Sequence, residues 1–179
     1  DESICDTRND GTATVPLVGD WGHIRFNSGS DDSSHITRAV IRYSGSDFGS
    51  AINDGAIYLT NASPILDHIT FSNNYINGVE LAGGNWTSDT WDNTTMIYVL
   101  EEGDITVLAA NTLTINPGMQ IKFGNDSDIF VNGKLMVPGT QANPVFFTSA
   151  NDDTRCGVGA SDESICDTRN DGTATVPLV

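Results

Sequence analysis

Apolar and polar residues alternate along this chain in runs of only three to five positions. Met119, Ile121 and Phe123 show the pattern, and Gly, Asn, Asp or Pro interrupts each such run. Alternate side chains of a β-strand face the same side, so short alternating runs between turn residues are typical of short strands. No segment keeps a 3.6-residue period over a convincing length; the best helical candidate, residues 95–100, fits a strand equally well. The sequence predicts an all-β protein.

The spacing of the expected strands further restricts which all-β fold is possible. From Ile105 onward their starts recur near positions 105, 113, 119, 129, 135 and 145. Three strands at this spacing make a coil of about 20 to 24 residues, the length of one rung in a parallel β-solenoid. No rung of such a fold can bury its interior alone, so stacking of rungs is expected to form the core.

The two ends of the chain are identical in sequence. DESICDTRNDGTATVPLV occupies residues 1–18 and again residues 162–179. Removing the copied 18 residues from the 179 leaves a repeat unit of 161 residues, room for about seven rungs of this length. We expect residues 1–18 to start one repeat, residues 19–161 to form its β-solenoid body, and residues 162–179 to start the next repeat of a tandem array.

The charge balance excludes several classes of partner. The chain has 24 acidic residues against 8 lysines and arginines, a formal charge of −16. Nucleic acids and anionic membranes require basic patches, so neither is an expected partner. No apolar run approaches the roughly 20 residues of a membrane span. An acidic surface fits simple solubility or the binding of divalent cations.

Two blocks of sequence resemble a known fold family. Residues 61–81 resemble a rung of the right-handed parallel β-helix proteins related in fold to pectate lyases, with Leu66, Ile69, Phe71 and Asn74 at the positions expected of such a rung. Residues 113–149, together with the Gly-Asp-Trp-x-x-Ile-x-Phe strand from Gly19, resemble rungs common in large secreted bacterial surface proteins. The resemblance implies a right-handed parallel β-helix with a long Asp/Cys loop at the repeat junction. It says little about function, because this architecture includes enzymes, adhesins and inert stalks.

An Asp-rich loop at the repeat junction is the strongest chemical feature. Asp167, Asp171 and Gly172 match positions 1, 5 and 6 of a calcium loop, in which Gly permits the sharp turn. Arg169 stands at position 3 and cannot ligate a cation, and no Glu follows at position 12, so a full EF-hand is excluded. A partial calcium site and a solvated polar turn both remain open. Further candidate ligands are Asp152 and Asp153 and, in the first copy, Asp6 and Asp10.

The cysteines fit the same junction. Cys156 and Cys166 lie ten residues apart, a separation that a disulfide closes easily, whereas Cys5 would find its partner outside this chain. A disulfide would contribute on the order of 2–3 kcal/mol and implies export to an oxidising compartment. Two buried thiols are the alternative. Zinc is not expected, because the histidines, His23, His35 and His68, are scattered.

The sequence features that would indicate glycosylation or sugar binding are weaker than those of the junction loop. Sequons begin at Asn61, Asn85, Asn93 and Asn125, and Pro64 makes the first a poor acceptor. The sequons at 85 and 93 lie in a polar stretch, expected to be an exposed excursion from the coil, that also holds Trp86 and Trp91. These tryptophans would either stack on sugar or, as we favour, cover the end of a core.

Catalysis is the competing class of function, since the fold often hosts polysaccharide lyases and hydrolases. Such enzymes cluster aspartates with Lys or Arg. The candidates are Asp67-His68, His23 and Asp31-Asp32, and none has the neighbouring residues of a known motif.

The sequence therefore favours a structural or adhesive unit of an extracellular fibre or cell-surface stalk that assembles with copies of itself. A polysaccharide-binding or polysaccharide-degrading module and a calcium-binding domain without assembly are the alternatives.

Overall fold

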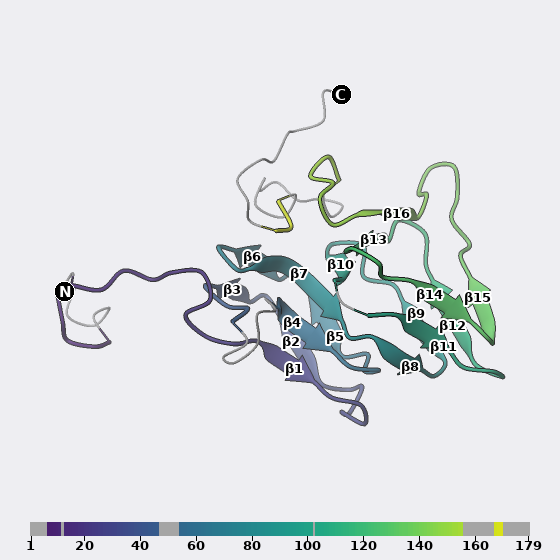
Figure 1. Ribbon diagram of the computed structural model, residues 1–179, viewed down its shortest axis with the longest axis horizontal. Helices are drawn as coiled ribbons and strands as arrows, with labels where there is room; N and C mark the ends of the chain where they lie inside the picture. Colours follow the sequence, from purple (N-terminus) through teal and green to yellow (C-terminus); the bar gives the residue numbers. More distant parts are fainter. Residues whose placement is uncertain (1–6, 12, 47–53, 102, 156–166, 170–179) are drawn as a thin grey trace.

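Every regular element in the described part of the chain is a β-strand. The computed structural model describes residues 7–11, 13–46, 54–101, 103–155 and 167–169. Within these ranges there are sixteen strands of three to six residues and no helix (Figure 1). The described part accordingly holds no helix long and apolar enough to cross a membrane. The all-β prediction is confirmed.

The largest sheet has six strands in the order β1-β4-β7-β10-β13-β16. Its members are β1 (Ile24–Phe26), β4 (Gly55–Leu59), β7 (Ile76–Leu81), β10 (Ile97–Leu100), β13 (Gln120–Phe123) and β16 (Phe146–Ser149). All five neighbouring pairs are parallel. Residues 97–100, within the best helical candidate, are therefore a strand of this sheet.

Four smaller sheets complete the fold. Two contain three strands each: β8 (Gly84–Trp86), β11 (Ile105–Val107) and β14 (Ile129–Val131) form one, and β9 (Asp89–Trp91), β12 (Thr112–Ile115) and β15 (Lys134–Met136) the other. Two contain a single pair each: β2 (His35–Thr37) with β5 (Ile65–Asp67), and β3 (Val40–Arg42) with β6 (Thr70–Ser72). These pairs are parallel as well.

Every described pair joins a strand with the third strand after it in sequence, so three consecutive strands make one set that stacks on the next. Between the second and third sets only β4 and β7 pair, because the sheets of β5 and β6 do not continue into β8 and β9. The described strands form five complete sets, and β16 begins a sixth. The six strand starts predicted from Ile105 onward lie within one residue of the observed ones. Parallel stacking of short strands is confirmed. The predicted number of seven rungs remains a prediction.

Corners between strands repeat from one set to the next because the same backbone conformation recurs. Arg38 (φ 56°) and His68 (φ 49°) follow β2 and β5, and Tyr43 (φ 62°) and Asn73 (φ 56°) follow β3 and β6. A single residue in the left-handed region turns the chain sharply without a longer loop. The Arg38 amide also donates to the Asp67 carbonyl (2.9 Å), which aligns one corner with the next.

The core consists of side chains aligned in rows across the sheets. In the six-stranded sheet Ile57, Val79, Tyr98 and Ile121 are consecutive partners in register, and each is at most 6% exposed. Residues at every second position of each strand contribute to such rows, which is why the alternation in the sequence is so short.

The stretch around the two tryptophans belongs to this core. Trp86 and Trp91 lie on β8 and β9, are 1% and 3% exposed, and pack edge to face with centroids 5.5 Å apart. The expectation of an exposed excursion is therefore wrong: Asn85 and Thr90 face outward while the two indoles point inward. Trp91 also stacks on Tyr98 at 6.0 Å.

Asn74, which matches a rung position of the resembling family, lies just after β6 and is fully buried. Its partner in the preceding set is Ser44, whose amide and hydroxyl donate to Asn74 Oδ1 at 2.9 and 2.8 Å. The polar groups at this corner are therefore paired between a serine and an asparagine.

Candidate functional site

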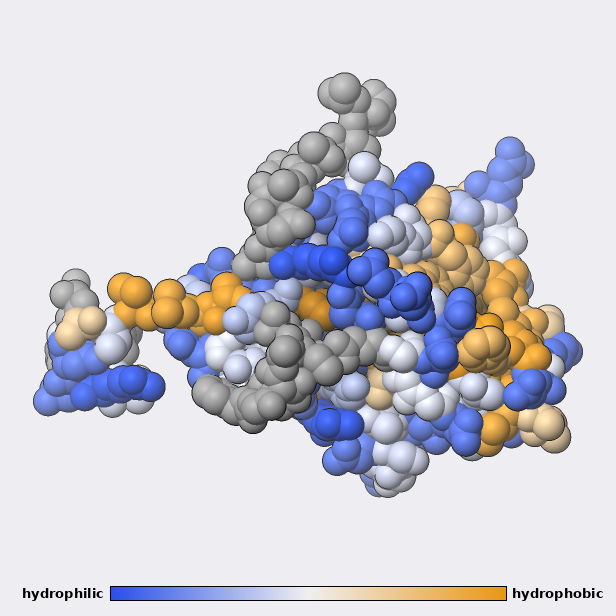
Figure 2. Space-filling model, viewed as in Figure 1, coloured by the Kyte–Doolittle hydropathy of each residue, from blue (hydrophilic) through white to orange (hydrophobic). Residues whose placement is uncertain are grey.

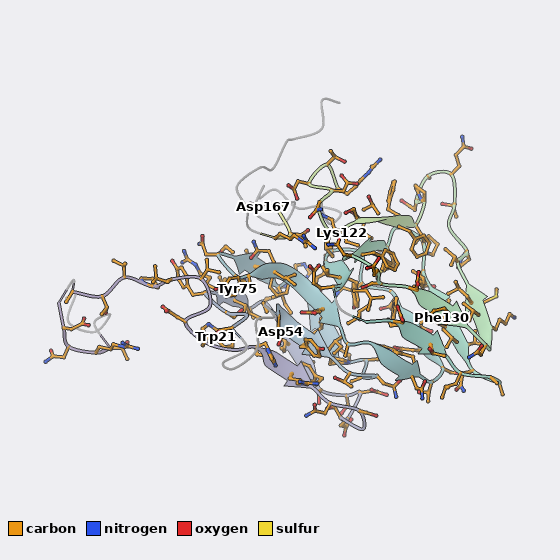
Figure 3. The ribbon with its side chains drawn as sticks, viewed as in Figure 1. Trp21, Asp54, Tyr75, Lys122, Phe130 and Asp167 are labelled. Atoms are coloured by element: carbon orange, nitrogen blue, oxygen red, sulfur yellow. The ribbon has the colours of Figure 1, made fainter. Side chains whose placement is uncertain are left out.

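A polar cluster lies on the outer side of the six-stranded sheet. Residues between the inward rows form an outward row, in which Glu80, Val99, Lys122 and Thr148 are consecutive partners. Such residues normally meet solvent. Here Glu80, Val99 and Lys122 are at most 1% exposed, so another layer covers the middle of the sheet on its outer side. Figure 3 shows Lys122 beside Asp167, at the top of the sheet in that view.

Lys122 on β13 is the centre of the cluster. The alternation of β13 turns Ile121 into the core and Lys122 outward. The Lys122 ammonium donates to the Asp152 carbonyl oxygen at 2.7 Å and to Thr168 Oγ1 at 2.6 Å. Burial lowers the pKa of Lys122 from 10.5 to about 8, although the negative charges of Asp153, Asp152 and Asp167 oppose this shift. The cluster thus encloses one positive charge among three aspartates.

The Asp152 turn forms one wall of the cluster. Its carboxylate accepts hydrogen bonds from Thr148 Oγ1 at 2.6 Å and from the Thr154 amide and hydroxyl at 3.0 and 2.5 Å. Burial by itself would raise the pKa of Asp152, but these hydrogen bonds and the charge of Lys122 outweigh it and lower the pKa. This ionised carboxylate holds the turn, which presents its carbonyl oxygen to Lys122.

Residues 167–169, from the second copy of the repeated segment, form the opposite wall. The Asn77 amide donates to the Thr168 carbonyl at 2.8 Å, and Asn77 Nδ2 donates to the Asp167 carbonyl at 3.2 Å. Arg169 forms an ion pair with Glu101, in which the two side chains are 30% and 20% exposed. Thr168 itself is fully buried. The described contacts therefore attach this tripeptide to β7 and β13 and to the residue after β10.

The first copy of the same segment has a different environment. Thr7 and Arg8 are exposed and lie in an N-terminal arm that projects away from the sheets (Figure 1). Local hydrogen bonds occur within the arm: Thr14 Oγ1 donates to Asp10 Oδ2 at 2.7 Å, and the Leu17 amide donates to Asp20 Oδ2 at 2.9 Å. Val15 and Leu17 are 70% and 62% exposed.

The predicted calcium ligands are thus only partly brought together. Asp152, Asp153 and Asp167 surround Lys122, and Asp10 lies in the arm. Among the described residues, no group of three His, Cys, Asp or Glu side chains is arranged to hold a metal ion. Asp6 and Asp171 lie outside the described residues, as do Cys5, Cys156 and Cys166. Calcium binding and the disulfide therefore remain predictions.

The sequons occupy different surroundings. Asn85 and Asn125 are exposed. Asn93 is partly buried and uses its amide nitrogen, the atom a glycan would modify, to donate to the Leu66 carbonyl. A glycan is sterically easiest at Asn85 and Asn125, and glycosylation itself remains a prediction.

The catalytic candidates are distributed over separate sheets. His68 Nδ1 lies 2.6 Å from Asp67 Oδ1 at an exposed corner after β5. His23, just before β1, lies 3.2 Å from Asp54 Oδ2 and stacks on Tyr58 at 5.4 Å. In the connection after β1, hydrogen bonds from the Ser33 side chain and amide lower the pKa of Asp31.

No family model, curated protein or solved structure matches this chain. The assignment of a site therefore depends on geometry alone. Four contributors to the cluster were missed by sequence reasoning: Asn77, Glu101, Lys122 and Thr168. The sequence did contain one signal. The chain has only two lysines, and the alternation around Ile121 places one of them, Lys122, on the outward side of a strand.

Proposed function

We propose that this chain is a right-handed parallel β-helix of about seven rungs per repeat, with an Asp/Cys loop at the repeat junction. In this proposal it stacks end to end with copies of itself in an extracellular fibre or cell-surface stalk with a structural or adhesive role. Support comes from the described strand pairs, each of which joins a strand in parallel with the third strand after it, and from rows of core residues that run along the stacking direction. Backbone pairing of this kind can continue from one unit into the next.

The observation that carries the proposal is the uncovered edge at β14, β15 and β16. Each is the last described strand of its sheet. Val131 and Phe147 continue the inward rows of Val107 and Ile121, yet they are 43% and 47% exposed. Apolar side chains gather on the side where β14 and β15 lie, at the right of Figure 2.

The opposite edge is chemically similar. Ile24, Phe26 and Ile36 on β1 and β2 are partly buried and pack against the main core from one side. A second copy placed with its β1 beside β16 would extend the sheet in parallel and cover apolar residues of both edges. Burial of apolar surface stabilises such a contact by about 25 cal/mol per Å².

Charge placed on the open edge tests this proposal. We expect the wild-type chain to form linear assemblies whose mass rises with concentration in sedimentation velocity and which negative-stain images show as rods. Val131→Lys together with Phe147→Lys should abolish them. Thr106→Lys, in the central strand of its sheet and on the outward side, should leave them unchanged. Discrete monomers of the wild-type chain at all concentrations, or equal loss in the Thr106 control, would contradict the proposal.

A polysaccharide-directed function has one observation in its favour. A cleft of about 270 Å³ lies between the two-stranded and three-stranded sheets, lined by Pro64, Leu66, Thr90, Trp91, Asn93 and Tyr98. The corner with Asp67 and His68 is close to it, since Ile65 and Leu66 line both this cleft and the adjoining one that includes Asp67. Trp91 is nearly fully buried, so it offers little surface for stacking on sugar. Depolymerisation of acidic polysaccharides that is lost in Asp67→Asn would favour this function over the structural one.

Export is part of the proposal, since a disulfide between Cys156 and Cys166 requires an oxidising compartment. Thiol titration of the chain, denatured without prior reduction, tests for this disulfide. One reactive thiol per chain, from Cys5, is the expected result. Three thiols would contradict the disulfide and remove the argument for export.

A further inference from the structure

One tripeptide of this chain occurs in two states. Asp-Thr-Arg stands at residues 6–8 and again at 167–169, each time inside the identical 18-residue segment. In the second copy Thr168 is fully buried and Arg169 is paired with Glu101. In the first copy the equivalent Thr7 and Arg8 are exposed. The Thr-Arg pair is thus docked on the sheet in the second copy, whereas the same two residues are exposed to solvent in the first.

The surface that holds the docked copy has a defined chemistry. We call Asn77, Glu101 and Lys122 the latch site, because each contacts the tripeptide. Asn77 binds two of its carbonyl oxygens, at 2.8 and 3.2 Å. Lys122 donates to the threonine hydroxyl at 2.6 Å, and Glu101 accepts from the arginine. The latch site therefore recognises backbone, hydroxyl and guanidinium groups that the first copy also carries.

The sheet edges offer no comparable selectivity. Stacking of apolar rows accepts any residue of suitable size, whereas the latch site combines a buried ammonium, a carboxylate and an amide at fixed positions on β7, β10 and β13 and their ends. Such polar complementarity sets which partner binds and in which register.

We propose that residues 6–8 of one copy of this chain bind the latch site of another copy in place of its own residues 167–169. The repeated segment then acts as an exchangeable latch that joins consecutive units. This inference rests on the proposed end-to-end assembly and adds the residues that would specify it. Because the fully buried Thr168 already occupies the hydrogen-bonding position at Lys122, one segment must leave before the other enters. The attached copy has the advantage of a high effective concentration, so exchange is slow until it is weakened.

Paired substitutions at the two copies of the threonine test the latch. Thr168→Lys places a second ammonium beside Lys122 and should expel the attached copy. With reducing agent present to prevent disulfide exchange, we expect the self-association of this variant to be at least about tenfold tighter than that of the wild-type chain. Thr7→Lys alone should show no such gain, and Thr7→Lys combined with Thr168→Lys should lose it. Association of the double variant equal to that of Thr168→Lys would overturn the proposal.

A labelled peptide separates binding at the latch site from folding and stacking. The probe has the sequence of residues 1–18 with Cys5→Ser, and its binding is followed by fluorescence anisotropy. It should bind the Thr168→Lys chain, and the same peptide with Arg8→Ala should bind about tenfold more weakly. If Thr168→Lys proves unfolded by circular dichroism, Arg169→Ala provides the opened site instead. Absence of peptide binding to a folded, opened chain would overturn the proposal.

The variant with lysines on the open edge distinguishes failure of the latch from failure of the proposed fibre. Val131→Lys with Phe147→Lys, added to the Thr168→Lys chain, should still bind the peptide while forming no rods. Rods from the wild-type chain, with no peptide binding to the folded Thr168→Lys chain, would leave the stacking proposal standing and reject the latch. Peptide binding to the Thr168→Lys chain, with no rods from the wild-type chain, would support the latch and reject the fibre.

Discussion

The two copies of the repeated segment differ in environment although they do not differ in sequence. Thr168 is fully buried against Lys122, and Thr7 is exposed in the N-terminal arm. Local propensity is the same for both, so contacts with the outer side of the six-stranded sheet must account for the difference. A segment this short and polar takes its structure from the surface it meets, because it cannot bury enough apolar area by itself.

The comparison also explains an unusual feature of the sheet. β7 and β10 are buried on both faces, whereas the outward positions of β11 and β12 remain partly exposed. The outward row of the six-stranded sheet contains charged residues that are normally solvated, Glu80 and Lys122 among them. Burial of such groups is tolerated where hydrogen-bonding partners are provided. The second copy and the Asp152 turn provide partners for Lys122.

Removal of the Lys122 side chain should have the largest effect on the second copy. Lys122→Ala takes away a fully buried side chain, its hydrogen bonds to Asp152 and Thr168, and the positive charge among Asp152, Asp153 and Asp167. We expect the free energy of unfolding to fall by about 3–5 kcal/mol, and limited proteolysis to cleave the second copy as readily as the first. Lys134→Ala on the exposed side of β15 should change stability by less than about 0.5 kcal/mol. Equal effects of the two substitutions would mean that the buried cluster does not hold the segment.

The lowered pKa of Lys122 should also be visible in the pH dependence of stability. Its pKa is lower in the folded chain, about 8, than the ordinary 10.5. The unfolded chain therefore binds more protons between these values, so this group makes the folded state more stable as pH rises. The gain is about 2 kcal/mol between pH 8 and 10. Lys122→Met should abolish it in urea titrations.

Above pH 10 a second group acts in the opposite direction. Burial, with smaller contributions from the charges of Asp92 and Asp89, raises the pKa of Tyr98 above its ordinary value of 10. The unfolded chain then loses a proton that the folded chain keeps, and stability falls. These two groups together place a maximum near pH 10, and a monotonic decline from pH 8 in the wild-type chain would contradict the Lys122 assignment.

Threonine-to-valine substitutions compare the two copies at one position each. Thr168→Val keeps the shape of a buried side chain but removes the acceptor of the Lys122 hydrogen bond, so we expect a loss of about 1–2 kcal/mol. Thr7→Val changes an exposed residue and should cost less than about 0.5 kcal/mol. Thermal melts of the two variants, recorded side by side, provide the measurement. A loss of the same size at both positions would show that the arm is docked as well.

The fold was largely predictable because the signal for it is local. Alternation around Ile121 and the turn residues between runs determined the strand type, and spacing alone located the strand starts after Ile105 to within one residue. The error at Trp86 and Trp91 arose from the polar composition of that stretch. Asn85 and Thr90 occupy outward positions of β8 and β9, and the polar composition therefore concealed the inward tryptophans.

The site was less predictable because its partners are distant in sequence. Lys122 and Thr168 lie 46 residues apart in the sequence, and nothing local to either residue indicates their contact. The identity of residues 1–18 and 162–179 was evident, yet identity does not say which copy docks. Asp152, Asp153 and Asp167, which the sequence suggested as calcium ligands, lie around Lys122. Their described positive partner is a lysine ammonium, whereas the spacing had suggested a calcium ion.

Calcium should therefore have a smaller effect on stability than any of the substitutions at Lys122 or Thr168. An added divalent cation would have to bind beside the Lys122 ammonium, which already lies among Asp152, Asp153 and Asp167. If the dissociation constant is near 1 mM, calcium at that concentration adds only about 0.4 kcal/mol to the free energy of unfolding. Melts with 1 mM calcium and with chelator should nearly coincide for the wild-type chain. A transition that falls by more than about 5 °C with chelator would instead support a genuine calcium site.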